Sequence, residues 1–174
     1  MRTSRQMRRL ADALIDPIRV PVPADPEALF DALVASVAQW RGREIVVRRE
    51  TFPPHTASGL WLEAGTHDVV VVDRRAAVWH QIVILCHEVW HMSRHTPHAD
   101  PSPAGDAPPR PVAARTDFSL TEEQEADRFG MLMGRRLRGW LEAPRDSVYA
   151  ARDDDAEGLA GRIGAALNYR GPHR

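Results

Sequence analysis

The sequence of 174 residues contains no lysine, so all 23 of its basic side chains are arginine, and it contains one cysteine, Cys86. The lack of lysine is typical of a chain encoded by a high-GC genome and says nothing about function. A single cysteine excludes an intramolecular disulfide and fits a reducing compartment. The apolar surroundings of Cys86 predict a buried apolar side chain rather than a metal ligand.

Long apolar runs and a large net charge are also lacking. No segment approaches the ~18 apolar residues of a membrane span, and no apolar region of a signal peptide follows the N-terminal arginines. The formal net charge is −1, so no global field recruits nucleic acid, and we expect no direct nucleic-acid binding. These observations predict a cytoplasmic protein with one compact domain over residues 1–174.

The most informative pattern that is present is His-Glu-x-x-His at residues 87–91. The surrounding residues 76–95 contain neither proline nor glycine and predict one amphipathic helix. At ~100° per residue, His87 and His91 fall about 40° apart on one face, where both can bind one tetrahedral metal ion. Glu88 lies beside them and can act as a general base on water. The opposite face is expected to enter the core through Val78, Ile82, Leu85, Val89 and Met92.

A zinc site needs a third protein ligand, and a later acidic segment supplies the candidates. A third histidine at the spacing His-Glu-x-x-His-x-x-Gly-x-x-His is excluded, because Arg94 and Pro97 occupy the required positions. Glu123 is the favoured ligand. Glu122 and Glu125 are rivals for the same role, and part of this acidic cluster would stabilise a helix N-terminus.

The helix that carries these carboxylates is expected to begin near Thr121, which forms a capping box with Gln124. Glu123 and Asp127 are four residues apart, so they share one helix face. Asp127 is predicted to accept a hydrogen bond from a ligating histidine, which would fix the tautomer and orientation of that ring.

These two motifs together resemble the ImmA/IrrE family of zinc metallopeptidases. The chain has His-Glu-Val-Trp-His at 87–91 and, about thirty residues later, Glu-Gln-Glu-Ala-Asp-Arg-Phe at 123–129. The apolar lead-in at 82–85 and His95 also match, and the resemblance spans roughly residues 59–135. The family usually has glycine at the position of Trp90, where an indole would narrow the cleft or change the packing beside the metal.

The resemblance implies a zincin-like fold and an intracellular zinc metalloendopeptidase with one Zn²⁺ per chain. Such proteins look like peptidases that cleave a helix-turn-helix transcriptional repressor, or like regulatory or toxin–antitoxin components of two-gene systems. The metal would be held by His87, His91 and Glu123, with Glu88 as the catalytic base. The oxyanion donor is not identified, and His67, His80, Tyr149 and several arginines are unranked candidates.

A second hypothesis is a non-proteolytic, zinc-stabilised regulatory protein that binds a partner without cutting it. The substitution Glu88→Gln separates the two hypotheses, because only a peptidase needs the general base.

We expect an α+β fold in which a small, mainly antiparallel sheet packs against the pair of metal-binding helices, with further helices at both ends. The β-branched run at 69–72 predicts a central strand, and the strand at 59–63 is expected to pair with an extended substrate at the sheet edge. Six prolines predict a flexible loop at 96–118. Helices are expected at 4–15, 26–40, 76–95, 122–140 and 156–167, and strands at 43–50, 59–63 and 68–73.

Overall fold

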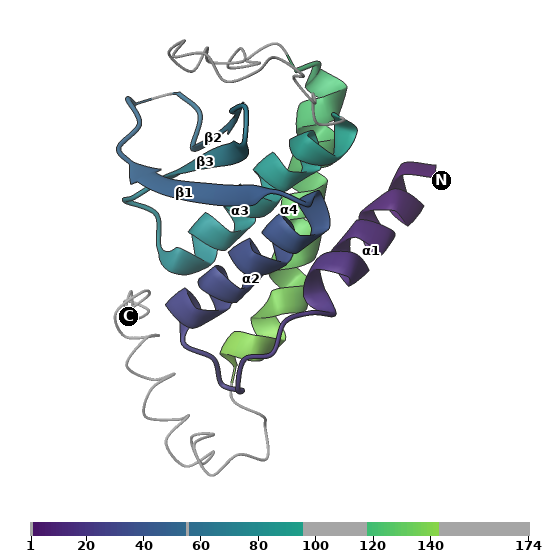
Figure 1. Cartoon of the computed structure of the whole chain (residues 1–174), viewed down its shortest axis with the longest axis vertical. Coiled ribbons are helices and arrows are strands. Elements are labelled where there is room, and N and C mark those ends of the chain that lie inside the picture. Colours follow the sequence, from purple (N-terminus) through teal and green to yellow (C-terminus); the bar gives the residue numbers. More distant parts are fainter. Residues whose placement is uncertain (1, 55, 96–117, 143–174) are drawn as a thin grey trace, which may run out of the picture.

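The computed structural model describes residues 2–54, 56–95 and 118–142. They form four helices and a three-stranded sheet (Figure 1), which confirms the α+β class. The helix expected at 156–167, the segment 96–117 and Tyr149 lie outside the described residues. In chain order the elements are α1 (Arg2–Ile15), α2 (Pro26–Arg41), β1 (Glu44–Glu50), β2 (Gly59–Glu63), β3 (His67–Asp73), α3 (Val78–Arg94) and α4 (Leu120–Leu141).

The sheet is mixed, so the prediction of a mainly antiparallel sheet is wrong. Its strand order is β1-β3-β2, with β2 antiparallel and β1 parallel to β3. Parallel pairing needs a crossover connection, and here residues 51–58 and β2 itself provide it. The apolar pattern predicts that a strand exists but not which neighbour it pairs with. The β-branched run lies in the central strand as predicted, and β2 forms one edge.

The N-terminal helices follow from local sequence signals. The apolar residues of α1 share one face, and Met7, Leu10, Ala11 and Leu14 are all buried. Helix α2 begins after Asp25, whose carboxylate accepts a hydrogen bond from the N–H of Ala28. It ends at Gly42, which has a left-handed φ of 72°.

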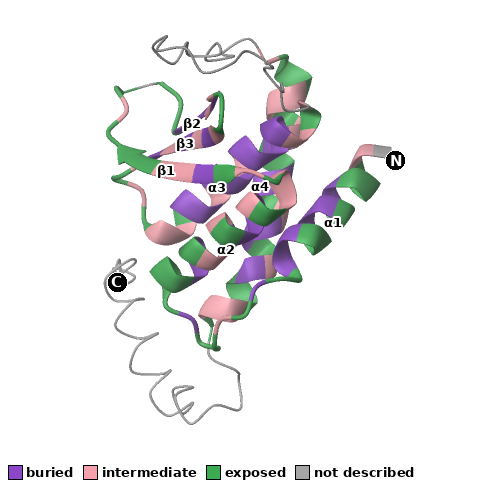
Figure 2. Cartoon of the chain, in the orientation of Figure 1, coloured by how far each residue is buried: buried purple, intermediate pink, exposed green. Residues whose placement is uncertain are grey.

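Helix α3 lies in the middle of the molecule. It contacts α2, α4, β2 and β3, while α1 packs against α2 and α4 (Figure 1). Figure 2 shows that the buried faces of the helices and strands turn toward this shared interior. Of the side chains predicted to face the core, Ile82, Leu85, Val89 and Met92 are fully buried and Val78 is half-buried. No helix among the described residues is long and apolar enough to cross a membrane.

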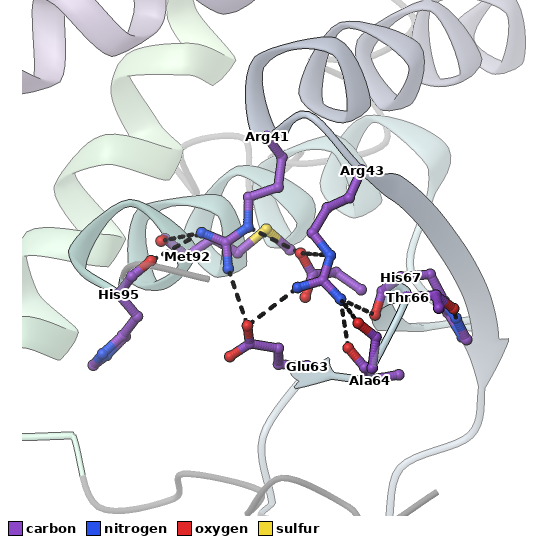
Figure 3. A network of polar contacts seen from close by, with 10 residues as sticks. Arg41, Arg43, Glu63, Ala64, Thr66, His67, Met92 and His95 are labelled. Carbon is purple, nitrogen blue, oxygen red and sulfur yellow. Dashed lines mark hydrogen bonds and ion pairs between the residues drawn. The ribbon is translucent and has the colours of Figure 1, made fainter. Parts of the chain in front are cut away.

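A buried ionic network crosses the sheet (Figure 3). Glu63 of β2 and Asp68 of β3 are register partners, and both are buried on the side of the sheet that faces α3. Arg41 Nε lies 2.9 Å from Asp68 Oδ2, and Arg43 Nη1 lies 3.1 Å from Glu63 Oε1. Each buried carboxylate therefore has a guanidinium partner, as a buried charge requires.

Arg41 also fixes the end of α3 (Figure 3). Its Nη1 donates to the carbonyl oxygens of Met92 at 3.0 Å and His95 at 2.9 Å, and its Cζ lies 5.4 Å from the ring centroid of Trp61. Carbonyl groups at a helix C-terminus lack partners within the helix. A single side chain from α2 therefore connects the C-terminus of α3 to the edge strand β2.

Candidate metal centre

Helix α3 presents the two histidines of the His-Glu-x-x-His motif on one face. The Nε2 atoms of His87 and His91 lie 3.1 Å apart, and the ring centroids are 4.9 Å apart. The His91 side chain is only 2% exposed, whereas that of His87 is 21% exposed. The pair therefore opens to solvent on the His87 side.

Glu123, from the first turns of α4, completes a group of three donors. Its carboxylate oxygens lie 3.4 Å from His87 Nε2 and 3.5 Å from His91 Nε2. Among the described residues, His87, His91 and Glu123 form a group that could hold a metal ion. Zinc bonds of about 2.0–2.1 Å place tetrahedral ligands roughly 3.3 Å apart, which matches these spacings.

Asp127 lies one turn further along α4 and contacts the other nitrogen of His87. The His87 Nδ1 and Asp127 Oδ1 atoms are 3.0 Å apart. A proton on Nδ1, donated to this carboxylate, leaves the Nε2 lone pair free to bind a metal. The structure thus brings Asp127 to the position that its predicted supporting role requires.

The N-terminus of α4 differs from the prediction. The capping residue is Ser119, not Thr121, and the helix begins at Leu120. Glu122 Oε2 accepts hydrogen bonds from the N–H and hydroxyl of Ser119, both at 3.0 Å. Two capping-box patterns overlap here, Ser119 with Glu122 and Thr121 with Gln124. The first one forms, and its Glu122 carboxylate is a stronger hydrogen-bond acceptor than the amide of Gln124.

This cap also bears on the rival ligands. The Glu122 carboxylate is engaged by Ser119, and these hydrogen bonds lower its pKa. Glu125 is half-buried and lies outside the group of metal donors. Of the three candidate carboxylates, Glu123 is the one that the fold places at the histidines.

Glu88 is buried beside the donors, with 6% of its surface exposed. Burial, and secondarily the charge of Glu123, raises the pKa of Glu88 to about 8, while the backbone N–H of Trp61 acts in the opposite direction. A β-carbon on Gly59 would lie 2.7 Å from Glu88 Oε1 and 2.5 Å from Ile84 Cγ2. Only glycine therefore lets β2 approach α3 closely enough for the Trp61 N–H to reach the carboxylate.

His91 is held as a neutral imidazole. Burial, followed by the neighbouring His87, lowers the pKa of His91 to about 4. The ring of Phe118 stacks on it, with centroids 3.6 Å apart and planes inclined by 15°. A ligand histidine must be deprotonated at its donor nitrogen, so this environment keeps His91 ready for a metal near neutral pH.

Helices α3 and α4 cross closely behind the donors, and two glycines permit this. A β-carbon on Gly130 would lie 3.0 Å from the carbonyl oxygen of Val83, and one on Gly134 would lie 3.2 Å from Val83 Cγ2. Together with the buried Ala126, these positions form a stripe of small residues along α4. The close crossing brings Glu123 within reach of the histidines.

The donors line a cavity of about 540 Å³ between α3, α4 and β2. The β2–β3 ladder extends through hydrogen bonds from Asp73 N–H to Ser58 and from Ala64 N–H to His67. Because ladder bonds alternate along an antiparallel strand, Gly59, Trp61 and Glu63 direct their main-chain groups away from β3. The outer edge of β2 therefore borders the cavity.

Phe118 was not predicted from the sequence, and Gly59 and Trp61 were predicted only as part of the edge strand without individual roles; all three line the cavity. The isolated glycine at the start of a strand was a usable signal for close approach of another chain segment. Of the oxyanion candidates, His80 lines the cavity and His67 does not.

Trp90 and Cys86 lie away from the metal donors. Trp90 is 1% exposed, packs its ring 5.4 Å from that of Phe129, and does not line the metal cavity. The indole packs against Phe129 of α4 and does not narrow the metal cavity. Cys86 is fully buried as predicted, and burial raises the pKa of its thiol.

Comparisons of the chain with protein-family models, with curated proteins and with solved structures find no match.

Proposed function

We propose that the chain is a zinc-dependent metallopeptidase that acts in the cytoplasm and binds one Zn²⁺ through His87, His91 and Glu123. The observation that carries the proposal is the group of three donors with Nε2 and carboxylate oxygen atoms 3.1 to 3.5 Å apart. Beside it lies a buried carboxylate, Glu88, which is the further group that hydrolysis needs. The motif resemblance to the ImmA/IrrE family supports the same assignment.

The chain's own residues supply the proton transfers. When bound, zinc acidifies water and polarises a carbonyl group. A nearby cation favours the ionised form of Glu88, which then takes a proton from the attacking water and delivers it to the leaving amine. Asp127 keeps the proton of His87 on Nδ1, and Phe118 shields the His91 ring from solvent.

The substrate class proposed is a protein segment in extended conformation. The outer edge of β2 offers main-chain groups of Gly59 and Trp61 beside the cavity, although the Trp61 N–H is already directed to Glu88. An extended peptide can pair with such an edge. Following the family resemblance, we propose a helix-turn-helix repressor as the substrate, in a two-gene regulatory or toxin–antitoxin system.

Elemental analysis of the purified chain tests the metal site. We expect about one zinc ion per chain, lost in His91→Ala and in Glu123→Gln. Glu125→Gln is the matched control, since it removes a carboxylate from the same helix outside the donor group, and it should retain zinc. Absence of zinc from the unsubstituted chain, even after zinc is added, would refute the proposal.

A cleavage assay with a helix-turn-helix repressor tests the activity. Glu88→Gln should bind zinc and the repressor but should not cleave it. The alternative, a zinc-stabilised regulatory binding protein, draws support from the raised pKa of Glu88, since a protonated carboxyl group cannot act as a base. Zinc-dependent binding without cleavage, unchanged by Glu88→Gln, would establish that alternative.

A further inference from the structure

A second cavity, of about 290 Å³, is bordered by α1, α2 and α3 and shares no residue with the metal cavity. Its lining comes from α1, from the C-terminal end of α2 and from the last turns of α3. Its walls are formed by Gln6, Arg9, Leu10, Ala13, Trp40, Trp90, Ser93 and Arg94.

The two charged side chains that line this cavity are both positive. Arg9 and Arg94 are both exposed, and neither forms an ion pair with another residue in the described part of the chain. None of the lining residues is acidic, whereas Glu88, Glu123 and Asp127 all line the metal cavity. Since the chain as a whole has a formal charge of only −1, this concentration of positive charge is local and favours an anion.

Two indoles form the aromatic part of the walls. Trp40 is half-buried, and Trp90 is 1% exposed, with Arg94 Cζ 6.0 Å from its ring centroid. The buried Trp90 Nε1 has no hydrogen-bond partner in the described part of the chain. Trp40 is the more accessible of the two indoles and is the one that a bound molecule can contact.

We propose that this cavity binds a small molecule that combines a planar aromatic ring with one anionic group, a carboxylate or a phosphate. The guanidinium groups of Arg9 and Arg94 bind the anion, and the half-buried indole of Trp40 contacts the ring. The volume accommodates a ring with its anionic substituent but not a folded partner. Because this cavity shares no residue with the metal cavity, the ligand binds without requiring the metal site.

Calorimetric titration of the metal-free chain tests this site with adenosine monophosphate and naphthoate as probes. We expect at least one of them to bind with a Kd below ~1 mM, and the preferred probe identifies phosphate or carboxylate as the anion. Adenosine or inorganic phosphate alone should bind ~10-fold more weakly or not at all. Failure of both aromatic anions to bind, or equal binding of inorganic phosphate, would overturn the proposal.

Paired arginine variants locate the binding. The double variant Arg9→Gln with Arg94→Gln should bind the preferred probe at least ~10-fold more weakly, since each charge-assisted hydrogen bond contributes strongly to the binding free energy. The control is the double variant Arg5→Gln with Arg8→Gln. It removes the same amount of charge from exposed residues of α1 that do not line the cavity. This control should change binding less than ~2-fold. Equal loss in both double variants would show a general charge effect and refute the site.

Discussion

At the residue scale, Glu88 depends on opposing influences that decide whether it can serve as a base. Burial and the charge of Glu123 favour its protonated form, while the Trp61 N–H favours the ionised form, and the resulting pKa is about 8. Without a cation the carboxyl group is therefore mostly protonated at pH 7. A dication bound at the neighbouring donors would shift this balance toward the carboxylate.

The raised pKa makes the stability of the metal-free chain depend on pH. The folded chain holds the Glu88 proton up to about pH 8, whereas the unfolded chain releases it near pH 4.5. The stability contributed by the neutral carboxyl group is thus complete below pH 4.5 and is lost as pH rises to about 8, by up to about 1.4 kcal/mol per pH unit. Glu88→Gln should remove this loss.

Urea unfolding in the presence of a chelator, at pH 6 and pH 8, measures the effect. We expect the stability of Glu88→Gln relative to the unsubstituted chain to increase by about 2 kcal/mol between these pH values. Comparing the two proteins at each pH cancels the opposite contribution of His91, whose pKa is lowered to about 4. A pH-independent difference would show that Glu88 has an ordinary pKa.

Gly59 controls the position of the Glu88 carboxylate. The β-carbon of Gly59→Ala would meet Ile84 Cγ2 at 2.5 Å and Glu88 Oε1 at 2.7 Å, so a side chain or the strand must move. We expect a loss of about 1–3 kcal/mol in the free energy of unfolding, and slower peptidase turnover at unchanged zinc content. Gly65→Ala is the control, since its β-carbon would meet nothing within 4 Å. Equal effects of the two substitutions would contradict this role.

At the scale of elements, the metal donors depend on how closely α4 crosses α3. Gly130→Ala would place a β-carbon 3.0 Å from the main-chain oxygen of Val83, which cannot rotate away as a side chain can. We expect α4 to shift by a few tenths of an ångström, which would weaken zinc binding ~10-fold because Glu123 moves with it.

A competition titration with a chromophoric chelator measures that zinc affinity, and Gly139→Ala is the matched control. Gly139 lies on the same helix, and its β-carbon would meet nothing within 4 Å. The control should leave zinc binding unchanged and stabilise the helix by up to about 1 kcal/mol. If Gly130→Ala also retains full affinity, the crossing does not set the donor geometry.

How far the elements follow from sequence depends on the range of the interactions. The strand at 59–63 and the helix after Asp25 were predicted closely, because alternation and capping are local patterns. The start of α4 was misplaced by about two residues where two capping patterns overlap. The parallel pairing of β1 was missed because no local pattern encodes it. Likewise, stacking of Phe118 on His91 joins segments far apart in the sequence.

At the scale of the whole molecule, Arg41 connects α2, the sheet and α3. Its side chain is 4% exposed, and it is the closest cationic partner of the fully buried Asp68. Arg41→Met would leave that carboxylate with only the more distant Arg43, so we expect a loss of about 3–5 kcal/mol in the free energy of unfolding.

The exposed ion pair between Arg49 and Glu27 supplies the comparison for this substitution. Arg49→Met should cost less than about 1 kcal/mol, because solvent screens the pair. Urea unfolding of Arg41→Met, Arg49→Met and the unsubstituted chain measures both losses in the free energy of unfolding. Similar small losses in both would mean that the buried network contributes no more than a surface pair.

The central position of α3 has a dynamic consequence. The helix contacts α2, α4, β2 and β3, and Arg41 binds carbonyl groups at its C-terminus, so neither its sides nor that end can open alone. Amide hydrogens of such a helix exchange with solvent only when the whole cooperative unit unfolds. We expect the amides of α3 to be the slowest to exchange deuterium among the described residues. His87 and His91 would then keep their spacing whether or not a metal ion is bound.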